Sequence, residues 1–328
     1  MVMFWVSLLA VSILLYVLLD GFDLGVGILF GLTSSEDRRR AMLSAVAPVW
    51  DGNETWLVVT GVILWGAFPL AYATLLSAFY LPLIFMLLGL ILRGVAFEFR
   101  YKTQRLRWIW DLSFAGGSLI ASFMQGLTVG ALVEELQMTD GQYSGGEFGW
   151  LTPFAVLCGI GLCLGYMLVG ACWLVSKCDA PVRDIARRQI PVLAVGVLLF
   201  LIVVFIHALV EALPIMHRWI DRPYLFIFPA IGAIAALVLA ASILHHNDRW
   251  PFYAVSIIFV TAFGTLAFSF WPYMIPFVIT IDQGAAPYST LDFMFWGEGI
   301  LVFPLMLFYT FVSYRVFRGK VEATTGHY

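Results

Sequence analysis

The N-terminal stretch MFWVSLLAVSILLYVLLDGFDLGVGILFG, residues 3–31, decides the fold class. It is apolar over more than the roughly 20 residues that a helix needs to cross the hydrocarbon core of a bilayer. A cleavable signal peptide would be shorter and would begin with positive charge, whereas no Lys or Arg precedes Arg38. We therefore expect a first transmembrane helix that is kept in the protein.

The composition extends this expectation to the whole chain. Hydrophobic residues make up 62% of the 328 residues and charged residues only 12%, and the mean hydropathy is +0.93. Soluble domains carry about twice that share of charge, roughly 25%. These values exclude a soluble enzyme and a disordered chain, and the net charge of −3 offers no basic surface for nucleic acid. The sequence therefore predicts an all-α polytopic protein with the lipid bilayer as its main solvent.

Further apolar stretches set the number of helices. The stretch from Trp56 to Phe97 is too long for one span, and Pro69 is the expected break because proline cannot continue a helix. The part before Pro69 is too short to cross alone, so we extend it backward through Pro48, which brings residues 50–54 to membrane depth. The sequence thus predicts a single membrane domain, 1–328, of about nine helices: 3–31, 45–68, 70–98, 112–135, 151–176, 190–213, 223–245, 251–279 and 293–315.

The basic residues give the orientation of this bundle. Of the 18 Lys and Arg residues, all but Arg93, Arg218 and Arg222 fall in the loops of one end or in the C-terminal tail. Cytoplasmic loops of membrane proteins are enriched in Lys and Arg. We therefore expect a periplasmic N-terminus and a cytoplasmic C-terminus in a multi-pass protein.

Two acids interrupt the first helix. Asp20 and Asp23 are three residues apart and so share one helix face, and ionisable residues at membrane depth are candidates for function. Gly21, Gly25 and Gly27 lie between and after them, at spacings that let another helix approach closely. Packing alone accounts for the glycines, but it does not account for the two carboxyl groups.

A second acidic pair opens the second predicted helix. Asp51 and Glu54 are again three residues apart, with Trp50 and Asn53 beside them. One interpretation is a functional pair at membrane depth. The other is that Asp51 caps a shorter helix at the interface.

The third predicted helix ends in mixed charge. Arg93 lies about one turn inside it, where we expect it to pair with Glu98 or Asp51, while Arg100 and Lys102 are either functional or a solvated basic flank. Taken by depth, the acids of helices 1–3 form a graded series from the cytoplasmic surface into the membrane. Such a series is typical of a proton uptake path.

The second half of the chain offers fewer candidates. His207 and Glu211 are four residues apart on one face, and Glu298 lies early in the last helix. His207 is better interpreted as a satisfied interior polar group than as a ligand. Five histidines, only one of them well inside a helix, are too few for several haems, and no metal site or catalytic residue is predicted in this chain.

Three motifs together resemble subunit II of cytochrome bd-type quinol oxidases, including the cyanide-insensitive branch. They are DGFDLGVG at 20–27, PVWDGNETW at 48–56 and RGVAFEFR at 93–100. The length and the predicted nine helices also fit. All three motifs lie in the first third of the chain, and the rest matches by hydropathy.

The resemblance implies a role in a bacterial inner-membrane complex. A haem-bearing subunit I, with haem b and haem d, would oxidise quinol and reduce oxygen to water, and this chain would supply a cytoplasmic proton path. The resemblance does not decide whether this chain binds a structural quinone, or whether a small single-helix accessory subunit joins the complex. By motif position the resemblance places the path at Asp23, Asp51, Glu98 and Lys102. The same resemblance implies that five further residues support this path: Asp20, Trp50, Asn53, Glu54 and Arg93.

Two other functions remain open at this point. In a proton- or ion-coupled secondary transporter the acids would bind the coupling ion, although such proteins often have two similar halves and no second acid set is seen in helices 5–7. In an assembly scaffold the acids would only hold helices together.

Overall fold

The computed structural model describes residues 1–103, 105–139, 142–211 and 213–321 and is almost entirely helical. In the first half the elements are α1 Val2–Gly31, α2 Glu36–Val46, α3 Trp50–Ala67, α4 Pro69–Arg100, α5 Arg107–Val133, β1 Met138–Thr139, β2 Gln142–Tyr143 and α6 Pro153–Lys177. In the second half they are α7 Val182–Val210, α8 Pro214–Asp221, α9 Ile227–Leu244, α10 Trp250–Phe270, β3 Tyr273–Ile275, β4 Ile279–Thr280, α11 Ile281–Gly284, α12 Tyr288–Met294 and α13 Phe303–Val316. A short 3₁₀ turn, Pro223–Phe226, leads into α9, and a π-helix, Phe295–Val302, joins α12 to α13.

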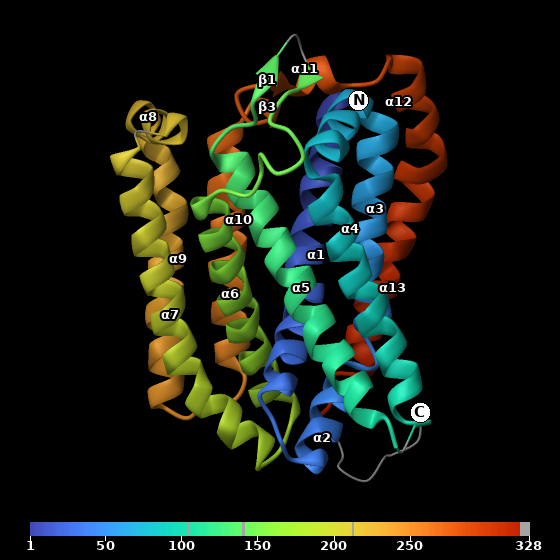
Figure 1. Ribbon diagram of the computed structural model, residues 1–328, viewed down its shortest axis with the longest axis vertical. Coiled ribbons are helices and arrows are strands. Elements are labelled where there is room, and N and C mark those ends of the chain that lie inside the picture. Colours follow the sequence, from blue (N-terminus) through green and yellow to red (C-terminus); the bar gives the residue numbers. More distant parts are fainter. Residues whose placement is uncertain (104, 140–141, 212, 322–328) are drawn as a thin grey trace.

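The long helices run side by side, and the two small hairpins lie at the end that holds the N-terminus (Figure 1). Eight helices of the described residues are long and apolar enough to cross a membrane. The eight do not include α3, whose first turn carries Asp51, Asn53 and Glu54, but α3 packs against α1 and α4 inside the bundle. The all-α polytopic class is confirmed.

Several helix ends differ from the predicted ones. The predicted helix 45–68 is two helices, because the chain turns at residues 47–49 and Val49 leaves helical geometry beside Pro48, which has no N–H to donate. The predicted helix 251–279 ends at Phe270, before Pro272, and a β-hairpin follows.

Charged residues explain why two other helices begin earlier than predicted. The helices predicted at 112–135 and 190–213 begin at Arg107 and Val182, because charged first turns continue the helix into water where hydropathy no longer marks it. The predicted end of the latter helix includes residue 212, which lies outside the described residues.

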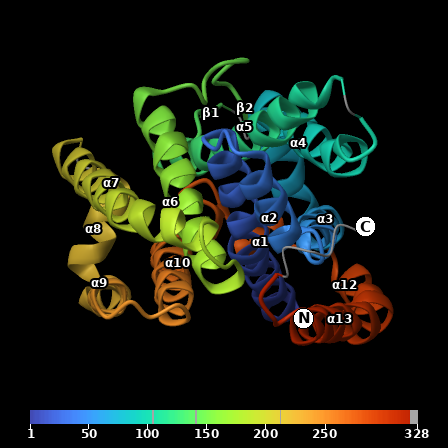
Figure 2. The ribbon, with the colours of Figure 1, turned by 90° about the horizontal axis from the view of Figure 1, so that it is seen from below.

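Helix α1 lies in the middle of the bundle, between α6 and α3 (Figure 2). On one side α6, α7, α9 and α10 pack together, and on the other α4 and α5 form the most extensive helix pair. Buried apolar side chains form two main clusters, one around Trp5 near the N-terminal end and one around Phe22 and Trp173 toward the other end.

Close packing around α1 depends on its glycines. A Cβ at Gly25 would lie 1.7 Å from the carbonyl oxygen of Tyr166 in α6, and one at Gly27 would lie 2.0 Å from Ser118 Oγ in α5. No real Cβ fits at such distances, so these positions require glycine. Gly21 likewise faces the Tyr166 ring. The glycine face of α1 therefore fixes α5 and α6 in place.

Candidate functional site

A fully buried arginine of α4 holds carboxylates from two neighbouring helices. Arg93 Nη1 lies 2.8 Å from Asp20 Oδ1 of α1, and both side chains are 0% exposed. Arg93 Nη2 lies 3.0 Å from Glu54 Oε1 of α3, whose side chain is 24% exposed. The guanidinium also lies 5.8 Å from the centroid of the Trp50 ring, which is stacked on Phe97. Arg93 therefore ties α1, α3 and α4 together inside the bundle.

The second acid of α1 has a different set of partners. Asn53 Nδ2 donates to Asp23 Oδ2 at 2.7 Å and to the Leu19 carbonyl at 3.2 Å, and the Tyr314 hydroxyl donates to Asn53 Oδ1 at 3.0 Å. Asp23 is 1% exposed, and its other carboxyl oxygen has no hydrogen-bond partner among the described residues. Asp23 is thus held by an amide and not by a cation.

These contacts leave an excess of acid in a buried region. Of the three carboxyl groups, those of Asp20 and Glu54 contact the single guanidinium of Arg93, whereas that of Asp23 is held by Asn53. Like charges close together in a low-dielectric interior disfavour ionisation of every member. We call these four residues, three acids and one arginine, the acid cluster.

A chain of hydrogen-bonded side chains, which the sequence did not predict, extends to the same part of α1. Gln125 Nε2 of α5 donates to the Tyr16 hydroxyl at 2.7 Å, and the Tyr166 hydroxyl donates to Gln125 Oε1 at 2.8 Å. Tyr16 precedes Asp20 by one helical turn, so both lie on one face. A lone Gln within an apolar helix was the available signal, since buried polar groups are nearly always paired.

Three of the predicted path residues lie outside the acid cluster. Glu98 and Lys102 pair with each other at 3.6 Å, and each side chain is 70% exposed. Asp51 is also exposed, one turn before Glu54 on α3, and Val49 takes the N-cap position instead of it. The expectation that Arg93 pairs with Glu98 or Asp51 is wrong, because five residues along α4 turn Glu98 well away from the face of Arg93.

A second ion network at the opposite end of the bundle from the N-terminus was also missed. Arg100 is 1% exposed and lies 2.5 Å from Asp111 Oδ1 and 2.8 Å from Glu36 Oε2. Arg39 joins Asp111 at 2.7 Å, and Arg107 joins Glu36 at 3.1 Å. The alternative of a solvated flank therefore does not hold for Arg100. The network fastens α2 to α4 and α5.

The charges of this network act on Glu36. Burial alone would raise the pKa of its carboxyl, but the hydrogen bond and the charge of Arg100, helped by Arg40 and Arg107, outweigh burial and lower the pKa below its usual value of 4.5. Glu36 is therefore ionised under ordinary conditions. Only the i,i+4 pair with Arg40 is visible in the sequence, because the other partners, Arg100 and Arg107, lie 64 and 71 residues away.

His207, interpreted from the sequence as a satisfied polar group, has protein partners in the structure. The ring of His207 is stacked on Phe154 with centroids 4.6 Å apart, and its Nε2 lies 3.9 Å from Glu134 Oε1. These contacts occupy it as an interior polar group. Among the described residues no group of three or more His, Cys, Asp or Glu side chains converges on a point where a metal could bind.

Comparisons with known proteins agree over almost the whole chain. The family described as cytochrome bd terminal oxidase subunit II matches residues 1–317. Similar proteins include a probable cytochrome oxidase subunit 2 of Haemophilus influenzae, 28% identical over 97% of this chain and 94% of that protein. The cytochrome bd-I ubiquinol oxidase subunit 2 of Escherichia coli is 26% identical with the same coverage. The cytochrome bd ubiquinol oxidase subunit 2 of Bacillus subtilis is 27% identical over 97% and 96%.

A solved structure supports the fold. The bd oxidase of Geobacillus thermodenitrificans contains a chain that superposes with a TM-score of 0.76, at 16% identity, covering 96% of this chain and 98% of that one. The secondary-transporter alternative is disfavoured by these matches. Together with the membrane helices they describe a multi-pass bacterial membrane protein. The chain belongs to the family of subunit II of cytochrome bd terminal oxidases, and it is thus one subunit of an oxidoreductase complex that contains haem and a partner subunit I.

Proposed function

We propose that this chain takes up protons from the cytoplasm and passes them through the acid cluster to a haem-bearing subunit I. In this proposal subunit I carries haem b and haem d, which supply the electron transfer from quinol to oxygen. The complex lies in the bacterial cytoplasmic membrane, with the N-terminus of this chain periplasmic and its C-terminus cytoplasmic. A structural quinone on this chain and a small single-helix accessory subunit are further components that the proposal allows.

The observation that carries the proposal is three carboxyl groups around one guanidinium in the middle of the bundle. Three carboxyl groups share this buried region with a single cation, so they outnumber it by two. A group of acids that retains a proton can also exchange it when a neighbouring site takes one. The acid cluster therefore suits a relay better than a purely structural tie.

A gradient of exposure supports the direction of this relay. Glu98 is 70% exposed, Glu54 is 24% exposed and Asp20 is 0% exposed. Asp51 lies exposed one turn from Glu54, so it is placed to pass protons between the surface and the acid cluster. The proposed order is thus Lys102 and Glu98 at the mouth, followed by the acids of α3 and then those of α1.

We further propose that the partner covers the outer faces of α3, α4 and α13. Acids at or near membrane depth are costly in lipid, and this side carries the exposed Asp51 and Glu98 and, on the π-helix, the partly buried Glu298. The three helices form one side of the molecule, since α13 contacts α3 at Tyr309 and Gly52. The exposed sides of α7 and α9 are apolar and suit lipid.

The test compares Asp51→Asn and Glu54→Gln in the assembled complex, with Glu211→Gln, an exposed acid at the end of α7, as the matched control. We expect Glu54→Gln to slow oxygen consumption by about 10²-fold, the low end for loss of a positioned proton-transfer group. Haem absorption should be unchanged in both variants. Normal turnover in both would refute the relay, and loss of haem absorption with the subunits unassembled would support the scaffold alternative instead.

A further inference from the structure

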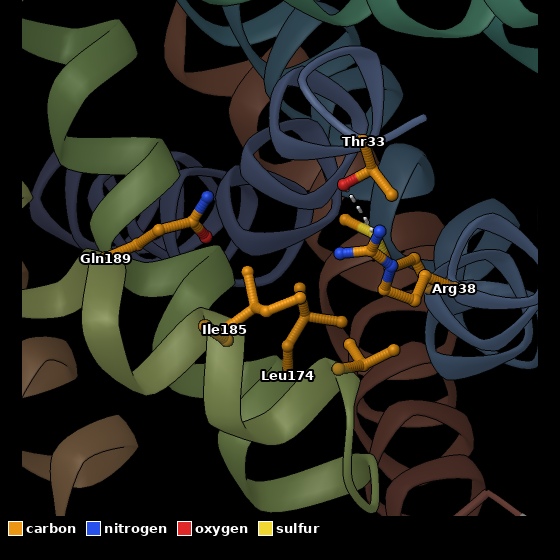
Figure 3. Close-up of a pocket in the computed structure, with 8 residues that line it drawn as sticks. Thr33, Arg38, Leu174, Ile185 and Gln189 are labelled. Atoms are coloured by element: carbon orange, nitrogen blue, oxygen red, sulfur yellow. Dashed lines mark hydrogen bonds between the residues drawn. The ribbon is translucent and has the colours of Figure 1, made fainter. Parts of the chain in front are cut away.

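A cleft opens at the end of the bundle opposite the N-terminus, between the end of α1, α2, α6 and α7. Its lining combines an arginine and an amide with an apolar floor: Thr33, Arg38, Met42, Leu174, Val182, Ile185, Ala186 and Gln189. Figure 3 shows the side chains of Arg38 and Gln189 pointing toward each other from opposite sides, with Ile185 and Leu174 between them. The cleft shares no residue with the acid cluster.

Arg38 differs from its neighbours in having no ion-pair partner among the described residues. Arg39 binds Asp111, and Arg40 binds Glu36. For the partly buried Arg38, in contrast, no ion pair or hydrogen bond to another described residue is present, and the same is true of the Gln189 side chain. A guanidinium has five N–H donors in a planar fork, and an amide adds two more. Within the described part of the chain, the cleft therefore presents unused donors and a positive charge without an ion-pair partner.

The size of the cleft limits what can bind. Its enclosed part measures about 10 Å³, which is room for a single group the size of a water molecule. A soluble metabolite cannot be engulfed there. A ligand must instead lie across the mouth and insert one small acceptor, such as a phosphate oxygen, between the guanidinium and the amide.

We propose that this cleft binds the phosphate of an anionic glycerophospholipid. Arginine is suited to phosphate because its fork matches two oxygens at once. Basic pockets between membrane helices on the cytoplasmic side are suited to lipid headgroups. The net negative charge of such a lipid balances the unpaired charge of Arg38.

The surface beside the cleft can take the acyl chains. One turn beyond Gln189 on α7, Val192 is 72% exposed, and Val195 and Leu199 are each 57% exposed. Their spacing of three and four residues forms one continuous apolar stripe that runs from the cleft along the helix. A headgroup at Arg38 would therefore place its tails against α7 in the bilayer, which a free phosphate ion would not need.

The test uses the purified complex after detergent delipidation, with phosphatidylglycerol as the probe. Bound lipid is counted by native mass spectrometry, and thermal stability is measured on adding phosphatidylglycerol, phosphatidylcholine or inorganic phosphate. Arg38→Gln should lose one bound phosphatidylglycerol per complex and bind it about tenfold more weakly, equivalent to about 1.4 kcal/mol. Arg38→Lys should retain an intermediate affinity, and Arg188→Gln, an exposed neighbour of Gln189, should behave as the wild type.

The proposal is overturned if Arg38→Gln retains the wild-type number of lipids, or if Arg188→Gln loses as many. It is also overturned if inorganic phosphate alone stabilises the wild-type complex as much as phosphatidylglycerol does, because the ligand is then a free anion. Equal stabilisation of the wild type by phosphatidylcholine would likewise refute it, even if the Arg38 variants did not assemble. Oxidase activity is not a readout, so the result is independent of the proton relay.

Discussion

Replacing Asp20 by Asn tests whether the Arg93 tie is a buried ion pair that stabilises the fold. The substitution keeps the size of the side chain and removes one charge from a pair in which both partners are 0% exposed. Removing one partner of a buried pair leaves the other charge uncompensated and costs about 3–5 kcal/mol. Because Glu54 still contacts the guanidinium, we expect the low end of that range, about 3 kcal/mol.

Glu54→Gln provides the internal comparison. Its carboxylate makes the other half of the same contact but is 24% exposed, so water offsets part of the loss. We expect about 1 kcal/mol, the upper end for a solvent-accessible pair. The double variant Asp20→Asn with Arg93→Gln should be less stable than Asp20→Asn alone, because Glu54 then loses the cation that it still contacts in the single variant.

Pulse proteolysis of the complex in mixed micelles, following the full-length band of this chain, measures these changes in the free energy of unfolding. Asp282→Asn, at an exposed acid of α11, is the control for handling and should match the wild type. Equal effects of Asp20→Asn and Glu54→Gln would refute the reasoning, because burial would then not decide the strength of the tie. A loss below about 1 kcal/mol for Asp20→Asn would refute it as well.

The remaining predictions concern the inner end of the bundle and the helix contacts. The pKa of Glu36 is lowered in the fold, so its contribution to stability is present at pH values above about 4.5 and is lost as the pH falls through the lowered pKa. Glu36→Gln should therefore remove this acid-dependent step from unfolding curves measured between pH 3 and 6. Gly25→Ala should abolish or strongly weaken folding because its methyl group would meet the α6 backbone, whereas Gly61→Ala, with open space around it, should not lower the yield of folded complex. Glu98→Gln should change the rate of oxygen consumption less than Glu54→Gln does, because water can replace a side chain that is 70% exposed; an equal loss would contradict the proposed order of the path.

The sequence predicted the parts of the fold that depend on local pattern. Apolar length marked the helices, and Pro69 marked the break between α3 and α4. Hydropathy did not predict the charged first turns of α5 and α7, nor the turn at Pro48 that separates α2 from α3. Helix ends in water are set by backbone geometry and charge, which an apolar count does not measure.

The sequence predicted which residues belong to the candidate site, but it did not predict which of them contact one another. Asp20, Asp23, Glu54 and Arg93 were selected because charge at membrane depth is costly. Which of them meet depends on the rotation of α3 and α4 about their axes, and hydropathy does not determine that rotation. Gln125 and Tyr314 complete the site from other helices, and a single polar residue in an apolar stretch is a weak signal without knowing its partner.

The sequence of the first motif, residues 20–27, reflects two different sets of neighbours that α1 contacts on its two sides. Asp20 and Asp23 face α4 and α3, where they meet Arg93 and Asn53. The glycines interleaved with them face α6 and α5, where no side chain fits. Acids and glycines can share this stretch because successive positions of one helix point in different directions, so neighbouring turns can hold charge on one side and permit backbone contact on the other. The same arrangement makes the acid cluster rigid, since the glycine contacts fix the rotation of α1 that aims both carboxyl groups. A substitution on the glycine face should therefore disturb proton transfer even where it leaves every ionisable group in place.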